Sequence, residues 1–190
     1  NTTQLINFTP VQIAAIETED VTALDQKISA LAANQVASLS SAQVSTIFAL
    51  SALPFADTQI KSISTAAINS LSSSDITKLS ESQMQELTAA QVGSLTYSQI
   101  NNLNQYKLQA IDARDIAFLN KTTLTNITST QLSKLSSAQV AAFTTDQAKS
   151  LNTLQIKGLT TEQLQSLSTA DIAALTTAQV TALTTEQLHA

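Results

Sequence analysis

Apolar residues recur every eight positions along this chain. From Leu135 the sequence reads LSSAQVAA, FTTDQAKS, LNTLQIKG, LTTEQLQS, LSTADIAA, LTTAQVTA and LTTEQLHA. When the positions of each unit are numbered one to eight, position one is apolar in every unit back to Phe8. This register requires a single seven-residue unit at residues 24–30. The array therefore covers the chain in about 23 units, and such a short period is typical of a repeat architecture.

Three other positions of the unit are equally patterned. Position six forms a second apolar row, in which Ala52 and Ala148 are the smallest members. Position two is Ser, Thr, Asn or Asp in 19 of 23 units, and position five is Gln or Asp in 18 of the 22 full-length units. A Ser or Thr followed three residues later by Gln is the capping box that begins an α-helix. Each unit thus carries its own helix start signal, and Pro10 falls on a first helical position, where its missing N–H is tolerated.

The geometry of helices and strands decides which regular structures are compatible with an eight-residue period. In one continuous helix, eight residues advance by about 800°, so the apolar rows would rotate by roughly 80° per unit and form no single face. In a regular strand, positions one and six would point to opposite faces. A β-solenoid with eight residues per coil could bury both rows, but Ala, Gln and Leu are weak strand formers and Gly-rich turns are absent. It stays an alternative at this point.

The pattern favours an all-α solenoid of about 23 eight-residue units, each a very short capped helix followed by a turn. We expect the helix at positions three to eight, with positions one and six facing a common axis. Residues 1–190 are expected to form a single repeat domain, a segment of a longer array, with irregular units at 24–30 and 47–54. A further departure is LNQYKLQA, where Lys107 replaces Gln. Two or three units per superhelical turn are both compatible with the spacing.

Composition and charge argue against several functions. The 190 residues include 9 Lys plus Arg, 14 Asp plus Glu and no Cys, with a formal net charge of −5. The cations are scattered singly, which disfavours a nucleic-acid partner, and no apolar stretch is long enough for membrane insertion. The one His, His189, has no catalytic partner pattern, so we expect no enzyme activity, no catalytic residues and no cofactor. The acidic cluster Glu17, Glu19 and Asp20 lacks the spacing of an EF-hand, so no metal site is expected.

The stretch LTTAQVTALTTEQL resembles the LTTxQ(V/I/L)xxL arrays of large exported and surface proteins of bacteria. That resemblance implies a structural or adhesive segment of an extracellular or cell-surface protein. The expected partners are other copies of the chain, bound head to tail or laterally, or another surface protein or glycan. The alternative is a protein- or glycan-binding α-solenoid module. Its interaction patch would comprise large side chains outside the core positions: Phe48, Leu50, Tyr97, Tyr106 and Phe118.

Overall fold

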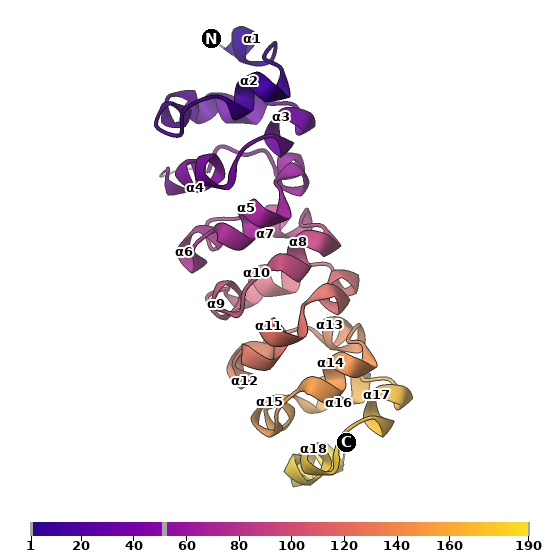
Figure 1. Ribbon diagram of the computed structural model, residues 1–190. Coiled ribbons are helices and arrows are strands. Elements are labelled where there is room, and N and C mark those ends of the chain that lie inside the picture. Colours follow the sequence, from indigo (N-terminus) through magenta and orange to yellow (C-terminus); the bar gives the residue numbers. More distant parts are fainter. Residues whose placement is uncertain (1, 51–52, 190) are drawn as a thin grey trace.

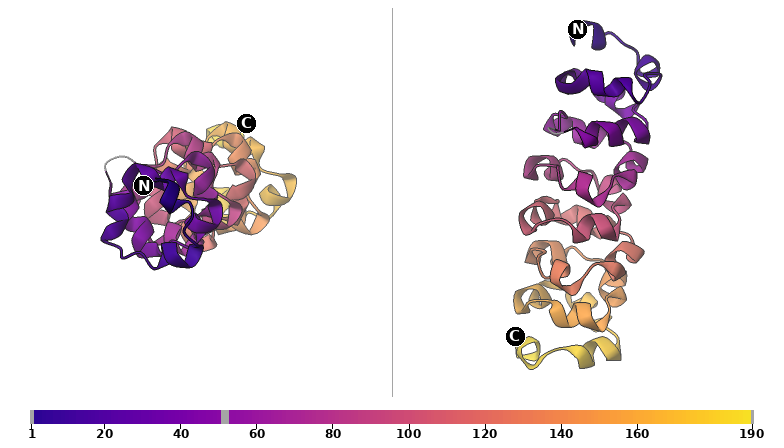
Figure 2. Two further views of the ribbon diagram at one scale, coloured as in Figure 1. Left: turned by 90° about the horizontal axis from the view of Figure 1, so that it is seen from above. Right: turned by 90° about the vertical axis from the view of Figure 1, so that its left-hand side faces the viewer.

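A rod of short helices forms the molecule in the computed structural model (Figure 1). The structure describes residues 2–50 and 53–189. Within these ranges every regular element is helical and no strand occurs, so the all-α repeat solenoid is confirmed and the β-solenoid alternative is wrong. Seen along the rod the helices surround a common axis, and seen from the side they form successive layers between the two ends (Figure 2).

The helices stack in three columns, because each packs on the helix three units further along the chain. For example, α13 and α16 begin at residues 137 and 161, which are 24 residues apart. Three units therefore make one turn of the superhelix.

The column memberships follow from this spacing. The first column holds α2 (Pro10–Ala14), α3 (Ala33–Ala37), η2 (Asp57–Ser62), α7 (Glu81–Gln85), α10 (Gln105–Ala110), α12 (Ser129–Leu132), α15 (Thr153–Gly158) and α18 (Thr177–Ala182). The second holds η1 (Asp20–Ala30), α4 (Ser41–Ala49), α5 (Thr65–Ser70), α8 (Ala89–Ser94), η3 (Ala113–Phe118), α13 (Ser137–Ala141), α16 (Thr161–Ser166) and α19 (Thr185–Leu188). The third holds α1 (Thr2–Leu5), α6 (Ser73–Ile76), α9 (Tyr97–Asn101), α11 (Lys121–Asn126), α14 (Thr145–Ser150) and α17 (Thr169–Ala173), and the ends of η1 and α4 extend into it.

One apolar core runs along the axis of the rod. Every described side chain at positions one and six between Leu31 and Leu167 is buried, as the pattern predicts. Burying a Leu, Ile or Val side chain contributes about 1.5–3 kcal/mol. The helices themselves are far shorter than the 12 or so residues that an isolated helix needs in water. Their stability therefore comes from this shared core.

The helix starts follow the predicted capping box. In α16 the N–H of Gln163 donates to Thr160 Oγ1 at 3.1 Å, and the N–H of Thr160 donates to Gln163 Oε1 at 2.9 Å. Where position two is alanine, the glutamine half of the box remains. The N–H of Ala32, for example, donates to Gln35 Oε1 at 2.8 Å. The chain can consequently begin a helix even where the cap side chain is missing.

Two stretches depart from one helix per unit. The 3₁₀-helix η1 runs through the end of one unit and all of residues 24–30. Helix α4 continues past Ile47 to Ala49, because Phe48 stands where a capping side chain would begin a new helix. Residues 51–52 of the irregular unit 47–54 lie outside the described ranges.

A charge placed in the core should unfold the neighbouring turns. Leu95 and Ile100 are 0% and 1% exposed, so Leu95→Asp or Ile100→Asp should lower the free energy of unfolding by about 3 kcal/mol or more. The exposed Ser98 lies between them, and Ser98→Asp is the matched control. Thermal melting followed by circular dichroism measures the difference. Equal melting of all three variants would contradict the register.

Removing a single cap should have a smaller effect. Thr176 accepts a hydrogen bond from the N–H of Gln179, whereas the neighbouring Thr177 is exposed at the first helical position. Thr176→Ala should therefore lower the free energy of unfolding by about 1 kcal/mol, and Thr177→Ala should leave it nearly unchanged. Urea denaturation of the two variants compares the same chemical change at adjacent positions. A larger loss in Thr177→Ala would show that the cap is misassigned.

Candidate functional site

The three exposed aromatic candidates lie on three different helices. Tyr97, Tyr106 and Phe118 have exposed fractions of 48%, 70% and 59%, so each is available to solvent. They lie on α9, α10 and η3, which belong to three different columns of the rod. The helices of the three columns surround the axis (Figure 2).

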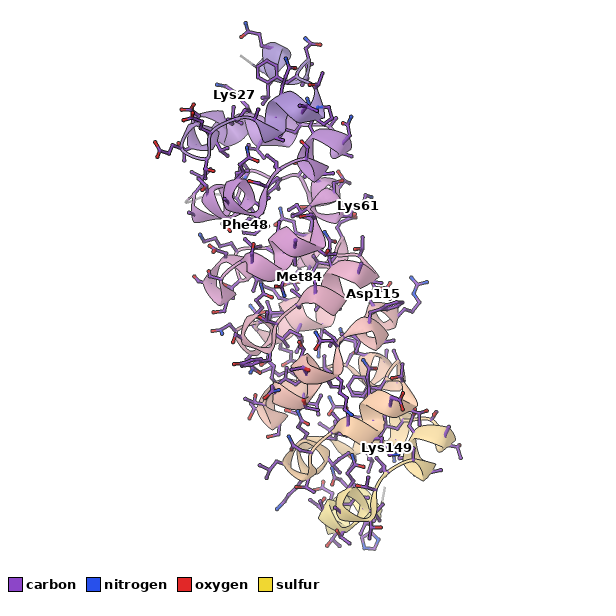
Figure 3. The ribbon with its side chains drawn as sticks, in the orientation of Figure 1. Lys27, Phe48, Lys61, Met84, Asp115 and Lys149 are labelled. Carbon is purple, nitrogen blue, oxygen red and sulfur yellow. The ribbon has the colours of Figure 1, made fainter. Side chains whose placement is uncertain are left out.

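Phe48 and Leu50 do not form the exposed pair of side chains that the sequence predicted. Phe48 lies on α4 among the stacked helices (Figure 3) and is fully buried, with its ring centroid 5.9 Å from that of Phe55. Leu50 is half-buried at the end of α4. The expectation that Phe48 is exposed was wrong because α4 does not end before Ile47 but continues to Ala49. Its extra turn brings the position-two side chain inward.

Other apolar side chains are exposed that the sequence did not single out. Leu154 and Val11 occupy position four and are 72% and 79% exposed. Position four already marks the outer face in the repeat, so their spacing could have identified them. In the final turn, the position-six residues Ile172, Val180 and Leu188 are 42%, 45% and 65% exposed, whereas an adjoining turn covers this position elsewhere.

The main polar feature of the interior is a row of buried glutamines at position five. Gln99 is 1% exposed, and its Oε1 accepts a hydrogen bond from the N–H of Thr96 at 2.8 Å. Its Nε2 donates to the carbonyl oxygens of Ile68 and Leu71, both at 2.8 Å, in the preceding turn. We call this pair of cross-turn bonds the glutamine clamp. Gln35 and Gln43 make equivalent contacts to carbonyls 27 and 30 residues earlier. Contacts to carbonyls 28 or 31 residues earlier are made by Gln59, Gln83, Gln91, Gln131, Gln139, Gln147, Gln155, Gln163, Gln179 and Gln187.

The clamp was not predicted, although its residues were. The capping box explains the glutamine oxygen but leaves the amide N–H₂ group without an acceptor. A buried donor without a partner costs about 1–3 kcal/mol, so its acceptor could have been sought in a neighbouring turn. Among the described residues, no buried side-chain nitrogen or oxygen lacks a hydrogen-bond partner.

Some units replace the clamp with other chemistry. Lys107 Nζ donates to the carbonyl oxygen of Thr77, and Thr123 Oγ1 donates to that of Leu95 at 2.9 Å. Asp171, which has no donor when ionised, instead accepts a hydrogen bond from Thr145 Oγ1 of the preceding turn at 2.9 Å. The interior therefore tolerates different side chains at position five.

A small charged group lies around η3. Arg114 Nη2 is 2.9 Å from Asp112 Oδ2, and the hydrogen bonds from the Arg114 side chain and backbone N–H lower the pKa of Asp112 to about 2. Burial raises the pKa of Asp115, the charge of Asp112 raises it further, and Arg114 opposes both. Figure 3 places Asp115 on the right-hand edge of the rod. These contacts account for the three charges without a ligand.

One depression of about 540 Å³ is lined by Gln85, Gln109, Ile111, Asp112 and Ser136 together with several alanines and Gln139. Asp112, its one ionisable lining residue, is already paired with Arg114. The described residues contain no group of three or more His, Cys, Asp or Glu side chains placed to hold a metal ion. Within the same residues, no helix has the length and apolar character required to cross a bilayer.

Comparison with known families identifies the repeat in the C-terminal part of the chain. Residues 140–177 and 156–190 match the model of the ALTTAQ repeat. These two overlapping matches fall where the eight-residue units are most regular. A comparison with curated proteins finds no match. The family matches support a repeat protein.

Converting a clamp glutamine to glutamate should destabilise the rod. In Gln139→Glu the oxygen that caps the helix is retained, but the donor to the carbonyls of Leu108 and Ile111 is lost and a charge faces them. We expect the free energy of unfolding to fall by about 3 kcal/mol. The control is Gln105→Glu at an exposed position. If thermal melting of the two variants is the same, the clamp does not contribute to stability.

Proposed function

We propose that the chain is a structural or adhesive repeat segment of an exported bacterial surface or fibre protein. Its function in this proposal is mechanical: it holds attached or neighbouring parts at a distance. No catalytic step is assigned to it. The C-terminal match to the ALTTAQ repeat and the likeness to LTTxQ(V/I/L)xxL arrays support the proposal.

The observation that carries the proposal is the continuity of the interior. A single apolar core and a row of glutamine clamps join successive turns along the rod. Most turns therefore contribute the same kind of contact to the next, which suits a spacer whose length depends on the number of units.

A binding module is the alternative, and one observation favours it. Tyr106 and Leu154 occupy position four on the first column, two turns apart, with exposed fractions of 70% and 72%. Large apolar side chains on an otherwise polar outer face are typical of contact points for a protein or a glycan. Replacing both with Ser should abolish binding to such a partner and leave thermal melting unchanged. The spacer proposal expects no loss of function in the same variant.

Surface labelling of intact cells tests the proposed location. In the organism that encodes the chain, antibodies against this segment should label unbroken cells, and added protease should remove the label. An antibody against a cytoplasmic protein of the same cells is the control. Label that appears only after the cells are broken would overturn the surface assignment.

Self-association of the 190-residue segment is the second part of the proposal. Val180 is 45% exposed although it occupies a core position, so an end-to-end contact between two copies would bury it. Sedimentation velocity should show concentration-dependent association that Val180→Asp weakens at least tenfold. Ala178→Asp, at an exposed outer position of the same helix, should have little effect. A segment that stays monomeric at every concentration would contradict self-association.

A further inference from the structure

Two neighbouring turns of the rod meet through different surfaces. The later turn supplies position-five glutamines, as when Gln179 Nε2 donates to the carbonyl oxygens of Ala148 and Leu151 at 3.0 and 2.8 Å. The earlier turn supplies position-six side chains. Leu5 and Ile13 of the first turn are 3% and 0% exposed although no described turn precedes them, so position six faces the following turn. Each turn therefore has a donor face toward the preceding turn and an acceptor face toward the following one.

The first turn, residues 2–23, exposes a donor face. Gln12 Oε1 accepts a hydrogen bond from the N–H of Thr9 at 2.8 Å, and Gln12 Nε2 has no acceptor among the described residues. The Gln12 side chain is exposed, whereas the other described position-five glutamines of the first column are buried. Phe8 at position one is 41% exposed, although position-one side chains between Leu31 and Leu167 are at most 6% exposed. This turn therefore presents a clamp donor and a core-position aromatic ring to solvent.

The final turn, residues 167–189, exposes an acceptor face at the opposite end of the rod (Figure 1). Its position-six residues Ile172, Val180 and Leu188 are 42%, 45% and 65% exposed. The carbonyl oxygen of Ile172 accepts the backbone N–H of Leu175 at 3.2 Å. Within the described part of the chain, no side chain donates to the carbonyl of Ile172 or of Leu175. Apolar core positions and clamp acceptors are thus exposed together.

The helices of these two turns occur in the same column order. The first turn runs through α1, α2 and η1, which lie in the third, first and second columns, and the final turn runs through α17, α18 and α19 in that same order. A second copy stacked on the final turn consequently continues all three columns, with its α2 over α18. Its Gln12 then has the same relation to the carbonyls of Ile172 and Leu175 as Gln179 has to those of Ala148 and Leu151.

We propose that copies of this chain join head to tail, with Gln12 of one copy clamped to the carbonyls of Ile172 and Leu175 of the next. The partner is a second copy of the chain, because each end face carries the half of the interior contact that the other lacks. Such a contact is heterologous and adds copies in one direction. This inference rests on the self-association part of the proposed function and specifies its polarity and its contacts.

The variant Gln12→Glu tests the clamp between copies. It keeps the oxygen that caps α2 but loses the amide donor and turns a negative charge toward two carbonyl oxygens. Sedimentation velocity should show association at least tenfold weaker than in the unsubstituted chain. The matched control is Val11→Glu, which adds the same charge at an outward position of the same helix, where Val11 is 79% exposed. It should change association less than twofold, and thermal melting at low concentration should show both variants folded.

The outcomes separate this inference from self-association in general. If the unsubstituted chain associates and Gln12→Glu associates equally well, the clamp between copies is wrong while self-association stands. If the unsubstituted chain stays monomeric at every concentration, both are wrong.

Mixing two blocked variants tests the polarity of the contact. Gln12→Glu leaves the final turn intact, and Val180→Asp leaves the first turn intact. Each variant alone should be monomeric where the unsubstituted chain associates, and an equal mixture should form pairs but no longer species. Pairs formed by either variant alone would show a contact between like ends and would overturn the head-to-tail arrangement.

Cross-linking tests the register of the columns. The chain has no cysteine, so single cysteines can be introduced at the exposed positions Val11, Ala170 and Ala178. Stacked helices lie about 8–10 Å apart, a distance that a short bismaleimide spans. Val11→Cys copies should cross-link to Ala178→Cys copies on α18 at least fivefold more than to Ala170→Cys copies on α17. Equal yields, or links mainly between two Val11→Cys copies, would contradict the continued columns.

Discussion

The buried glutamine amide at position five is the interaction on which the rest of the structure depends. Its oxygen completes the start of its own helix, and its nitrogen donates to carbonyls of the preceding turn, as in Gln99. Because the carboxamide group is planar, both contacts together orient each helix start relative to the carbonyl groups of the preceding turn of the rod. Local helix formation and the stacking of turns consequently share one polar group, and losing either contact would leave a buried polar atom unsatisfied.

That dependence explains how helices of four to six residues form a stable rod. Such helices have too few internal hydrogen bonds to offset the cost of nucleation. The core rows at positions one and six supply the favourable burial, but apolar contacts alone do not specify one register. The glutamine clamp does, because a shift of one turn by a single residue would move its donors away from the carbonyls. The apolar rows thus provide stability, and the clamps select the register.

The outer positions are free to vary because they take little part in either role. Tyr97, Tyr106 and Leu154 are exposed without disturbing the helices that carry them. At position five, by contrast, Lys107, Thr123 and Asp171 each retain a polar link to the preceding turn. A rod with a continuous apolar core and a variable surface is compatible with either a structural or a binding role, and the choice between these depends on the surface of the whole protein.

The sequence by itself determined the repeat, the two core rows and the helix starts, because these depend on spacing within one unit and on contacts three residues apart, such as Thr160 with Gln163. The tertiary structure alone decided that three units make a turn, that the glutamine nitrogen reaches carbonyls 28 or 31 residues earlier, that Phe48 is buried, and that the exposed aromatics lie on different columns. These features depend on the angle between successive helices at the short connection that joins them. A small change in that angle accumulates over successive units, so only the packing of complete turns against one another determines it.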